Sequence, residues 1–408
     1  MNINARKDVK LDNRNRVLDL LRGYGSADIS RLAELTGLSK LTVSKIIHHW
    51  RDKGVVIPTG KGNAAGEAAG KKPTLYSINS EYRLIFVTQL YETSLLSAVA
   101  NLNANIIMSE RVAYGKDTRL ETILGYAREA FDRMSAALKL NDARFGSVVL
   151  GTSGITDSNE GVIVFSPHFR SWGYNIPVVG MLREIFPRGY AFHVDNWVRY
   201  QAYAESKIGA ARQVNRFLEI GCEPDGVTSG LVWDGTLVSG KRGLAGEIGH
   251  MPVDPDSDIV CACGGRGCLE PAISLMRMQG RARETAGDWP DSALCRDRDP
   301  QTITYREVFA AADAADAFAR HLLDRPAKYF AAAISHVVQV CDPELIIIQG
   351  EYAAAGEYFL ESLRDRVRKA TLPSVEKNIQ IQYSSLGDKQ GLIGAAFFAA
   401  DQFYASLE

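Results

Sequence analysis

Three short segments near the N-terminus carry apolar residues at every third or fourth position, which is the pattern of amphipathic helices. The first helix is expected over residues 13–24 and the second over residues 28–36, with Asp28 as the N-cap of the second. Gly37 then permits a tight turn, and Ser39 is a suitable cap for a third helix. The pattern therefore predicts three helices in quick succession, the last two joined by a short turn.

Two β-rich runs follow the third helix, at residues 54–58 and 75–78, on either side of a Gly/Ala-rich loop. Two helices, a turn, a third helix and a hairpin are the elements of a winged helix-turn-helix, whose last helix enters the major groove of DNA. The sequence favours this DNA-binding module, over residues 1–80, against a small helical protein-interaction domain.

From residue 83 onward the apolar positions follow the patterns of strands, separated by longer helical segments. Strands are expected at 84–90, 95–102, 105–112, 146–150, 192–195, 216–221, 228–233 and 345–349. Helices are expected at 120–138, 198–208, 314–341, 354–370 and from residue 391. This alternation predicts an α/β architecture that begins with antiparallel strands.

The distribution of charge also changes at the end of the N-terminal module, near residue 80. Residues 1–80 hold 14 Lys and Arg against 7 Asp and Glu, a balance of +7, whereas the remaining residues hold 33 against 41, a balance of −8. A basic module joined to an acidic body indicates that the two parts have different partners, and the phosphates of nucleic acid suit the basic part.

Polar and basic side chains mark the expected DNA surface. On the third helix they lie opposite the apolar face, and two lysines close the loop of the hairpin before a proline, where they suit phosphates or a narrow minor groove. The candidate DNA-binding residues are Ser39, Lys40, Thr42, Ser44, Lys45, His48, Lys71 and Lys72.

Composition excludes several classes of protein. The 408 residues are 46% hydrophobic and 23% charged, so neither a disordered nor a fibrous chain is indicated. The N-terminus is polar and charged, unlike a secretory signal, and no apolar run approaches the roughly 20 residues that cross a bilayer. A cytoplasmic protein without a membrane partner is expected. Disulfides are rare in that compartment, so clustered cysteines there are more often metal ligands or catalytic thiols.

Three of the six cysteines, Cys261, Cys263 and Cys268, lie close together and a short distance after His250. One imidazole and three thiols form a Cys₃His set, which is one of the tetrahedral ligand sets of structural zinc. The glycines between the cysteines allow the backbone to turn so that the thiolates face one centre. The spacing differs from the common C-x₂-C knuckle, so a regular zinc finger is not expected.

A catalytic thiol, a disulfide and chance clustering are the alternatives to a zinc clip. A catalytic cysteine needs a base and an open position, which four ligands around one ion do not leave. A disulfide is disfavoured by the compartment, and chance clustering does not account for the glycines and the histidine. Structural zinc is therefore favoured. Cys222, Cys295 and Cys341 stand alone and are expected to carry no chemistry.

Two runs together resemble the signature of the ROK family (repressors, open reading frames and sugar kinases). These are Gly-Glu-Ile-Gly-His at 246–250 and Cys-x-Cys-Gly-x-x-Gly-Cys-Leu-Glu at 261–270. Segments at 151–157, 342–348 and 391–396 resemble further family segments, in the expected order. The resemblance covers nearly the whole chain.

The resemblance implies a two-lobed, actin-like (ribonuclease H-like) α/β fold with a sugar in the cleft. Lobe 1 would comprise residues 81–195, completed by about residues 385–408, and lobe 2 would comprise residues 196–384 with the zinc motif. Family members with an N-terminal winged helix are sugar-responsive transcriptional regulators.

A kinase of this family is expected to have a Gly-rich phosphate turn between the first two strands and an Asp that takes the proton from the sugar hydroxyl. At the turn this chain reads Gln-Leu-Tyr-Glu-Thr, residues 89–93, where Glu92 repels phosphate and no glycine lets backbone amides approach. Trp197 stands in the place of the Asp and cannot accept that proton. Thr228 and the run at 349–351 also replace glycines of the pattern. Phosphoryl transfer is therefore expected to be absent, and the protein is not expected to be an enzyme.

The sugar side of the family pattern is better preserved, because several positions that hydrogen-bond sugar hydroxyls carry matching residues. His168 stands where the family often has Asn, and Trp172 and Trp197 offer stacking faces, so the identity of the ligand stays open. The sugar-binding residues that the resemblance implies are Asn196, Glu247, His250, Glu270, His168 and Trp197.

The sequence thus predicts a regulator of carbohydrate metabolism genes, in particular a repressor, that binds palindromic operator DNA as a homodimer or homotetramer. A sugar or sugar derivative would be its effector, and half-sites are expected about one helical turn apart or a multiple of it. Two alternatives stay open: a sugar kinase that also regulates, and a regulator whose signal is a protein partner.

Overall fold

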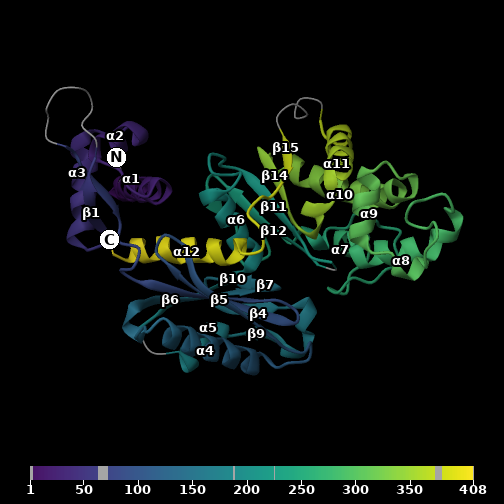
Figure 1. The fold of residues 1–408 in the computed structure, drawn as a ribbon, viewed down its shortest axis with the longest axis horizontal. Coiled ribbons are helices and arrows are strands. Elements are labelled where there is room, and N and C mark those ends of the chain that lie inside the picture. The colour runs from purple at the N-terminus through teal and green to yellow at the C-terminus, as the bar shows by residue number, and fades with distance from the viewer. Residues whose placement is uncertain (1–2, 63–71, 187–188, 225, 373–378, 408) are drawn as a thin grey trace. The chain divides into compact units, whose positions relative to one another are not determined.

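The computed structural model describes residues 3–62, 72–186, 189–224, 226–372 and 379–407. At its N-terminus, three helices precede a two-stranded antiparallel hairpin (Figure 1). They are α1 (Ile3–Tyr24), α2 (Ile29–Thr36), α3 (Lys40–Asp52), β1 (Val56–Lys61) and β2 (Thr74–Ile78). The five predicted elements are therefore present. Helix α1 begins earlier than predicted, because its first residues include good helix formers but no apolar stripe.

Side chains and a glycine fix the junctions between these helices as the sequence predicted. Asp28 Oδ1 accepts a hydrogen bond from the amide of Ser30 at 2.7 Å, and Ser39 Oγ accepts one from the amide of Thr42 at 3.1 Å. Gly37 ends α2 with a φ of 70°, a left-handed conformation that a glycine adopts at little cost. These contacts set where α2 stops and where α3 begins.

The chain folds into two compact units that interleave along the sequence. Unit 1 comprises Met1–Thr152, Pro177–Val194 and Leu392–Glu408, and unit 2 comprises Ser153–Ile176 and Asp195–Gly391. The chain crosses from one unit to the other four times, so neither unit is a single stretch of sequence.

Beyond the N-terminal module, unit 1 contains a five-stranded sheet in the order β10-β6-β3-β4-β5. The central strand β3 is buried along its length and pairs antiparallel with β4 and parallel with β6. Helix α4 packs on one face of the sheet and α12 lies on the other (Figure 1). The elements are β3 (Leu84–Leu90), β4 (Ser94–Asn101), β5 (Ile106–Ala113), α4 (Leu120–Ala137), β6 (Phe145–Thr152), α5 (Val178–Ile185), β10 (Ala191–Asn196) and α12 (Gln390–Ser406).

The N-terminal module packs against α12 through a buried cation. Arg22, near the end of α1, donates to Asp401 at 3.0 Å, and its guanidinium lies 5.0 Å from the ring centroid of Phe397 and 5.5 Å from that of Tyr404. The buried ring of Trp50 on α3 meets Tyr404 edge-on at 5.8 Å. Helix α12 therefore contacts both the first and the third helix of the module.

Unit 2 is built around a second five-stranded sheet in the order β13-β12-β11-β14-β15, and a small sheet β7-β8-β9 belongs to the same unit. Strands β11 and β14 run parallel and β12 runs antiparallel to β11. The strands are β7 (Ile155–Asp157), β8 (Val162–Phe165), β9 (Tyr174–Ile176), β11 (Phe217–Cys222), β12 (Val227–Trp233), β13 (Thr236–Leu237), β14 (Leu345–Gly350) and β15 (Gln380–Tyr383). The helices are α6 (Trp197–Ile208), α7 (Leu269–Ile273), α8 (Leu275–Thr285), α9 (Tyr305–Asp313), α10 (Ala317–Cys341) and α11 (Gly356–Ala370).

All predicted strands and helices are present, and most of their ends lie within three residues of the predicted ones. The helix predicted at 314–341 begins later, because Asp316 caps α10 by accepting from the amide of Ala319 at 2.9 Å and Ala315 has a φ of 67°. The sequence patterns missed β7 to β9, β13, β15, α5 and α7 to α9. No described helix is long and apolar enough to span a membrane.

The buried cation of unit 1 gives the first testable prediction. Replacing Arg22 by Met is expected to destabilise unit 1 by about 3 kcal/mol, because the carboxylate of Asp401 loses its charge partner in a largely buried position. Arg31→Met is a matched control, because its ion pair with Glu34 at 2.8 Å is exposed to solvent and should contribute little to stability. Urea unfolding measures both variants, and equal shifts would contradict the role of Arg22.

Candidate functional site

The Gly-Glu-Ile-Gly-His run lies flat against β12. A Cβ atom at Gly246 would lie 2.8 Å from the carbonyl oxygen of Ser229, and one at Gly249 would lie 2.4 Å from that of Val227. Neither approach is open to a larger residue, so both glycines are required for this contact. The close packing fixes the backbone of Glu247, which stands between them.

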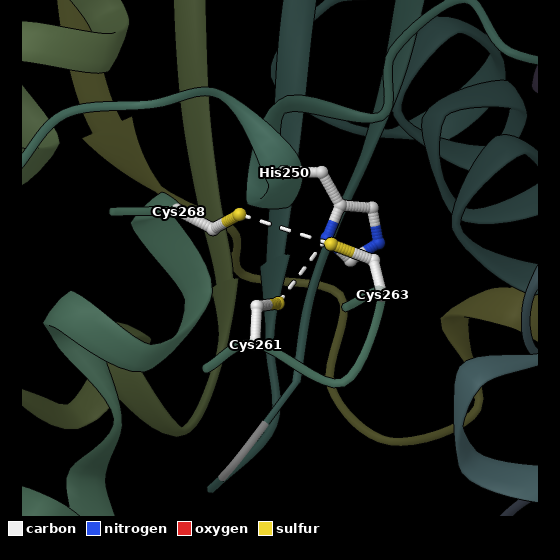
Figure 2. A group of neighbouring side chains, drawn as sticks. All are labelled: His250, Cys261, Cys263 and Cys268. Atoms are coloured by element: carbon white, nitrogen blue, oxygen red, sulfur yellow. Dashed lines mark hydrogen bonds between the residues drawn. The ribbon is translucent and has the colours of Figure 1, made fainter. Parts of the chain in front are cut away.

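His250 and the three predicted cysteine ligands bring their side chains to one point (Figure 2). All four ligand atoms lie within 4.8 Å of one another. The sulfur atoms of Cys263 and Cys268 are 3.8 Å apart, and the sulfur of Cys261 lies 3.6 Å from Nδ1 of His250. Sulfur atoms that share one tetrahedral zinc at about 2.3 Å stand about 3.8 Å apart, so the spacing is compatible with such a site. The cluster is a metal-binding candidate, and the sequence predicted its members.

Short-range contacts build the cysteine loop and explain its glycines. The amide of Cys261 donates to the carbonyl of Gly265 at 2.8 Å, and the amide of Gly264 donates back to the carbonyl of Cys261 at 2.9 Å. Gly267 has a φ of 71°, and a Cβ there would lie 2.4 Å from the carbonyl oxygen of Asp254. The close approach at Gly267 therefore requires a residue without a side chain.

Glu270, predicted to bind sugar, is 6% exposed, and both of its oxygen atoms already have partners. Oε2 accepts from the amide of Val227 at 3.1 Å, and the thiol of Cys261 donates to Oε1 over 3.6 Å. The side chain thus links α7 to β12 and to the metal candidate. A sugar hydroxyl would have to share these oxygen atoms.

Asn196 and Trp197 stand at the start of α6, and both are buried. The amide oxygen of Asn196 accepts from the amide of Val198 at 3.2 Å, and its amide nitrogen donates to the carbonyl of Gly154 at 3.0 Å. The indole of Trp197 is 4% exposed. These two residues therefore contribute to capping and packing, and neither has a largely exposed side chain.

His168 belongs to a short 3₁₀ segment, η2 (Pro167–Trp172), and its side chain lies outside the described part of the structure. Trp172 in the same segment stacks on the buried ring of Phe169, with centroids 3.9 Å apart and an angle of 8° between the planes. One face of the Trp172 indole is therefore covered within the segment itself.

The carboxyl group of Glu247 has no hydrogen-bond partner among the described residues. Burial raises its pKa to about 7, the guanidinium of Arg199 opposes this rise, and Glu270 adds to it. At neutral pH the group therefore occurs both protonated and ionised, so it can donate or accept a hydrogen bond. Of the predicted sugar-binding residues, Glu247 is thus well suited to a hydroxyl ligand.

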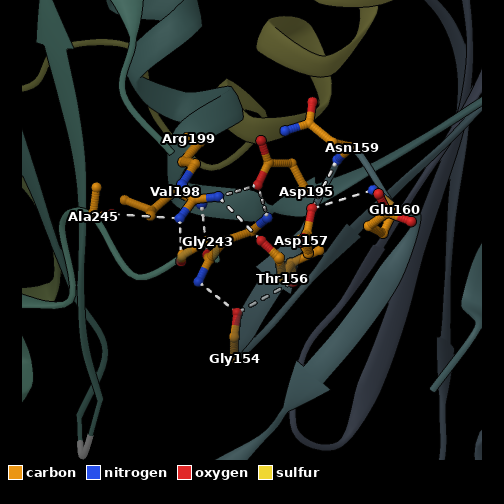
Figure 3. A network of polar contacts seen from close by, with 11 residues as sticks. Gly154, Thr156, Asp157, Asn159, Glu160, Asp195, Val198, Arg199, Gly243 and Ala245 are labelled. Atoms are coloured by element: carbon orange, nitrogen blue, oxygen red, sulfur yellow. Dashed lines mark hydrogen bonds and ion pairs between the residues drawn. The ribbon is translucent and has the colours of Figure 1, made fainter. Parts of the chain in front are cut away.

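Arg199 forms a network that the sequence analysis missed (Figure 3). Its guanidinium is 2% exposed and donates to the carboxylate of Asp195 and to the carbonyl of Gly243, each at 2.6 Å. Longer contacts of 3.4 Å reach the carbonyls of Thr156 and Ala245. One side chain therefore joins the end of β10, the small sheet and the loop that leads to the Gly-Glu-Ile-Gly-His run.

The backbone packs closely beside the Arg199 network. A Cβ at Gly243 would lie 2.0 Å from the carbonyl oxygen of Thr156, so the loop passes the small sheet at a distance that only glycine allows.

The carboxyl group of Asp195 is subject to opposing effects. Burial raises its pKa, while the charge of Arg199 and the hydrogen bond from the amide of Asn196 lower it. The spacing of four residues between Asp195 and Arg199 was a readable signal of an ion pair at the start of a helix.

Polar contacts are found at the three places where the sequence was predicted to depart from the glycines of the family pattern. Thr228 donates through its hydroxyl to the carbonyl of Gly221 at 3.4 Å. Glu351 accepts from Arg306 at 2.8 Å and 2.9 Å. In unit 1, Lys116 forms an ion pair of 2.7 Å with Glu92, in the turn between β3 and β4.

A cavity of about 400 Å³ in unit 2 touches the metal candidate. Cys261 and Glu270 line it together with Met276 and Arg277, whereas Glu247 does not. The cavity is therefore distinct from the surroundings of Glu247, although it shares Glu270 with the predicted sugar-binding set.

The predicted DNA-facing side of α3 is largely open. Lys40, Lys45 and His48 are exposed. Thr42 and Ser39 are bound to each other through their hydroxyl groups at 2.8 Å, so they also serve the helix cap. The opposite side of α3 is buried, as predicted, through Val43, Ile46, Ile47 and Trp50.

The remaining predicted DNA-binding residues are Ser44 on α3 and the two lysines of the hairpin. Ser44 is half-buried and lies 3.5 Å from Nδ1 of His48. Lys72 is exposed, and Lys71 lies outside the described residues.

Comparison with known proteins places these observations in a family. Residues 92–402 match the model of the ROK family. The match spans more than half of the chain, and the chain belongs to the ROK family.

The similar proteins include both transcriptional regulators and sugar kinases. The chain is 25% identical to the xylose repressor of Caldicellulosiruptor bescii, over 93% of this chain and 94% of that one. It is 25% identical to the DNA-binding transcriptional dual regulator NagC of Escherichia coli, over 95% and 92%. It is 34% identical to a glucokinase of Halalkalibacterium halodurans, but this match spans only 51% of this chain and 63% of the glucokinase.

Solved structures show the same mixed α/β fold. A ROK family transcriptional regulator, a homolog of the E. coli MLC protein, superposes with a TM-score of 0.79 at 22% identity and covers 98% of both chains. A ROK family glucokinase from Streptomyces griseus superposes with a TM-score of 0.64 at 24% identity, over 77% of this chain and 98% of the kinase. The fold is thus shared by a regulator and by a kinase.

The Arg199 network gives the second prediction. Arg199→Met is expected to destabilise unit 2 by about 3–5 kcal/mol, because Asp195 stays buried without its cation and backbone carbonyls lose their donor. Burial already raises the pKa of Asp195, and loss of the cation raises it further. The part of the penalty due to Asp195 is therefore present above the raised pKa and decreases as falling pH protonates this carboxyl group. The stability difference between the two proteins should narrow toward pH 4, and the part due to the carbonyl groups should remain.

Urea unfolding between pH 7 and pH 4 measures this effect. Arg216→Met is the control, because its ion pair with Asp234 at 2.8 Å is exposed to solvent and should contribute little to stability at any of these pH values. A penalty for Arg199→Met that is constant with pH would show that Asp195 is not the uncompensated group.

Proposed function

We propose that the chain is a sugar-responsive transcriptional repressor of carbohydrate metabolism genes that transfers no phosphate. The observation that carries the proposal is the joining of a basic three-helix module, with exposed cations on one side of α3, to a ROK domain. Two relatives that match over more than nine-tenths of both chains are named a xylose repressor and a DNA-binding transcriptional regulator. A regulator of this kind acts in the cytoplasm, where the chromosome lies.

In this proposal the N-terminal module is a winged helix-turn-helix and α3 is its recognition helix. The caps at Asp28 and Ser39 fix the turn, and the exposed side of α3 presents Lys40, Lys45 and His48 to the groove. Lys72 at the hairpin would contact the backbone beside it. The protein would bind a palindromic operator as a homodimer or homotetramer, because each module reads one half-site.

The effector is proposed to be a sugar or sugar derivative bound around Glu247. Its carboxyl group is without a hydrogen-bond partner in the described structure and suits a hydroxyl. His250 directs Nδ1 to the cysteines, which leaves Nε2 for a second hydroxyl. Asn196, Glu270, Trp197 and His168 would shape the surroundings of the ligand.

The residues in the first turn of α6 support the proposal that the protein has no kinase activity. Trp197 occupies the place of the general base, and the neighbouring polar side chains of Asn196 and Arg199 are already bonded within the protein. No side chain there is arranged to take a proton from a hydroxyl. The glucokinase match keeps a sugar kinase as the second candidate.

The metal candidate is proposed to be a structural zinc site. Three thiolates and an imidazole satisfy a tetrahedral ion completely and leave no open position for substrate. Bound zinc would cross-link the loop after Gly249 to the start of α7. This cross-link would hold Glu247 and Glu270, which belong to the two connected segments, in a fixed arrangement.

The zinc site gives the third prediction. Mass spectrometry of the intact protein under native conditions is expected to find one zinc per chain. Cys263→Ser should lose the metal and lower the thermal midpoint, because binding to the folded state stabilises it. Cys295→Ser is the matched control, since that cysteine lies outside the cluster, and it should keep one zinc. Full zinc content in Cys263→Ser would contradict the assignment.

DNA binding gives the fourth prediction. Selection from a random DNA library with the whole protein is expected to enrich a palindrome, and a thermal-shift screen of monosaccharides and disaccharides is expected to find the effector. Lys40→Ala should weaken binding to that palindrome and lower the slope of affinity against salt by about one unit for each module, because this exposed lysine suits a phosphate. Lys328→Ala, an exposed lysine of α10, should change neither quantity.

The same preparation separates the alternatives. The effector sugar is expected to change the affinity for the palindrome without any consumption of ATP. Sugar-dependent turnover of ATP that is lost in Glu247→Ala would favour the kinase. If the palindrome binds but no sugar alters its affinity, a protein partner is the signal.

A further inference from the structure

An exposed leucine stands in the first turn of α3. Leu41 is 67% exposed, whereas the other aliphatic residues of the helix, Val43, Ile46 and Ile47, are at most 6% exposed. Single exposed leucines are common on protein surfaces and by themselves imply nothing. The place of Leu41 within the helix carries the inference.

Leu41 forms one row with three polar residues. Positions 41, 44, 45 and 48 are spaced as i, i+3, i+4 and i+7, so they share one side of the helix, opposite the buried one. Lys45 and His48 in this row are exposed, and Leu41 is its N-terminal end. The row therefore presents an apolar group first, and a cation one turn later.

The neighbouring polar side chains at the start of α3 have other roles, so Leu41 is the one available for an apolar contact. The hydroxyl groups of Ser39 and Thr42 are bound to each other at 2.8 Å, and Ser39 also accepts from the amide of Thr42. Lys40 is exposed beside them and suits a phosphate. Leu41 can serve neither a phosphate nor a polar base atom.

We infer that Leu41 contacts the 5-methyl group of a thymine in each operator half-site. This inference rests on the proposed function, in which α3 enters the major groove. The N-terminal residues of a recognition helix contact base edges, and the thymine methyl is the apolar group that the major groove displays. A leucine placed against the charged backbone instead would desolvate phosphates without replacing their hydrogen bonds.

The geometry of the row also relates this thymine to a second base. Leu41 and Lys45 are four residues apart, which is about 6 Å along the helix axis. Base pairs are stacked about 3.4 Å apart, so Lys45 lies about two steps from the thymine. Lysine prefers O6 and N7 of guanine, and a guanine within about two base pairs of the thymine is therefore part of the expected half-site.

The test uses deoxyuridine, which differs from thymidine only by the missing methyl group. In the palindrome selected with the whole protein, each thymidine is replaced in turn, symmetrically in both half-sites, and affinities are measured for the unmodified protein and for Leu41→Ala. At one position the unmodified protein should lose about fourfold for each half-site, the effect of one buried methyl group. Leu41→Ala should bind both DNAs equally, because it no longer touches the methyl.

Two control variants define the result. Val9→Ala removes another exposed apolar side chain, 61% exposed on α1, and should keep the full deoxyuridine penalty. Lys45→Ala should bind every DNA more weakly but also keep that penalty. Unfolding midpoints of all variants should match that of the unmodified protein, since the side chains removed are exposed.

The experiment distinguishes a failure of the role of Leu41 from a failure of the proposed function. If a palindrome is selected but the deoxyuridine penalty is absent, or is the same in Leu41→Ala, the role of Leu41 is overturned and the proposed repressor function stands. If the whole protein selects no sequence, the proposed function and the role of Leu41 fail together.

Discussion

The candidate site depends on the hydrogen bonds and the ion pair that the buried guanidinium of Arg199 forms. It neutralises Asp195 and binds carbonyl oxygens of Gly243 and of the small sheet, and it is almost fully removed from water. Buried charges are tolerated only when they are paired and hydrogen-bonded, so these segments must assemble around it. The loop that it holds continues directly into Gly246 and Glu247. A residue with no predicted ligand role thus determines where the predicted ligand groups stand.

Unit 1 uses a buried cation in a similar way. Arg22 links α1 to Asp401 on α12, and two aromatic rings of the same helix lie against its guanidinium. Because Trp50 of α3 also contacts α12, the expected recognition helix and the C-terminal helix are packed together. The chain passes from unit 2 into unit 1 within α12, between Gly391 and Leu392. In the proposed function, sugar and DNA must change each other's affinity reciprocally, and the covalent crossings between the units are available for that coupling.

The sequence predicted features that depend on neighbouring residues. Helix periods, the caps at Asp28 and Ser39 and the glycines of the cysteine loop are local, because each contact spans only a few positions. The metal candidate was predictable for the same reason. The partners of Arg199 could not be inferred so easily, since Gly243 lies 44 residues away in the sequence. The short strands of the small sheet were missed because three or four residues are too few to show a period.

The metal candidate and the catalytic base of the family depend on different parts of the chain, so one can persist without the other. The cysteine loop is set by its own backbone contacts and by Glu270, whereas the base belongs to the first turn of α6. In that turn Asn196 caps the helix, Trp197 packs and Arg199 ties in the loop. Every one of these roles favours a fixed structure over proton transfer. Binding a neutral hydroxyl needs only positioned donors and acceptors, and Glu247, with a pKa of about 7, can be either. In the proposed function, a site arranged in this way recognises a sugar without activating it, because Trp197 is buried at the position proposed for the base.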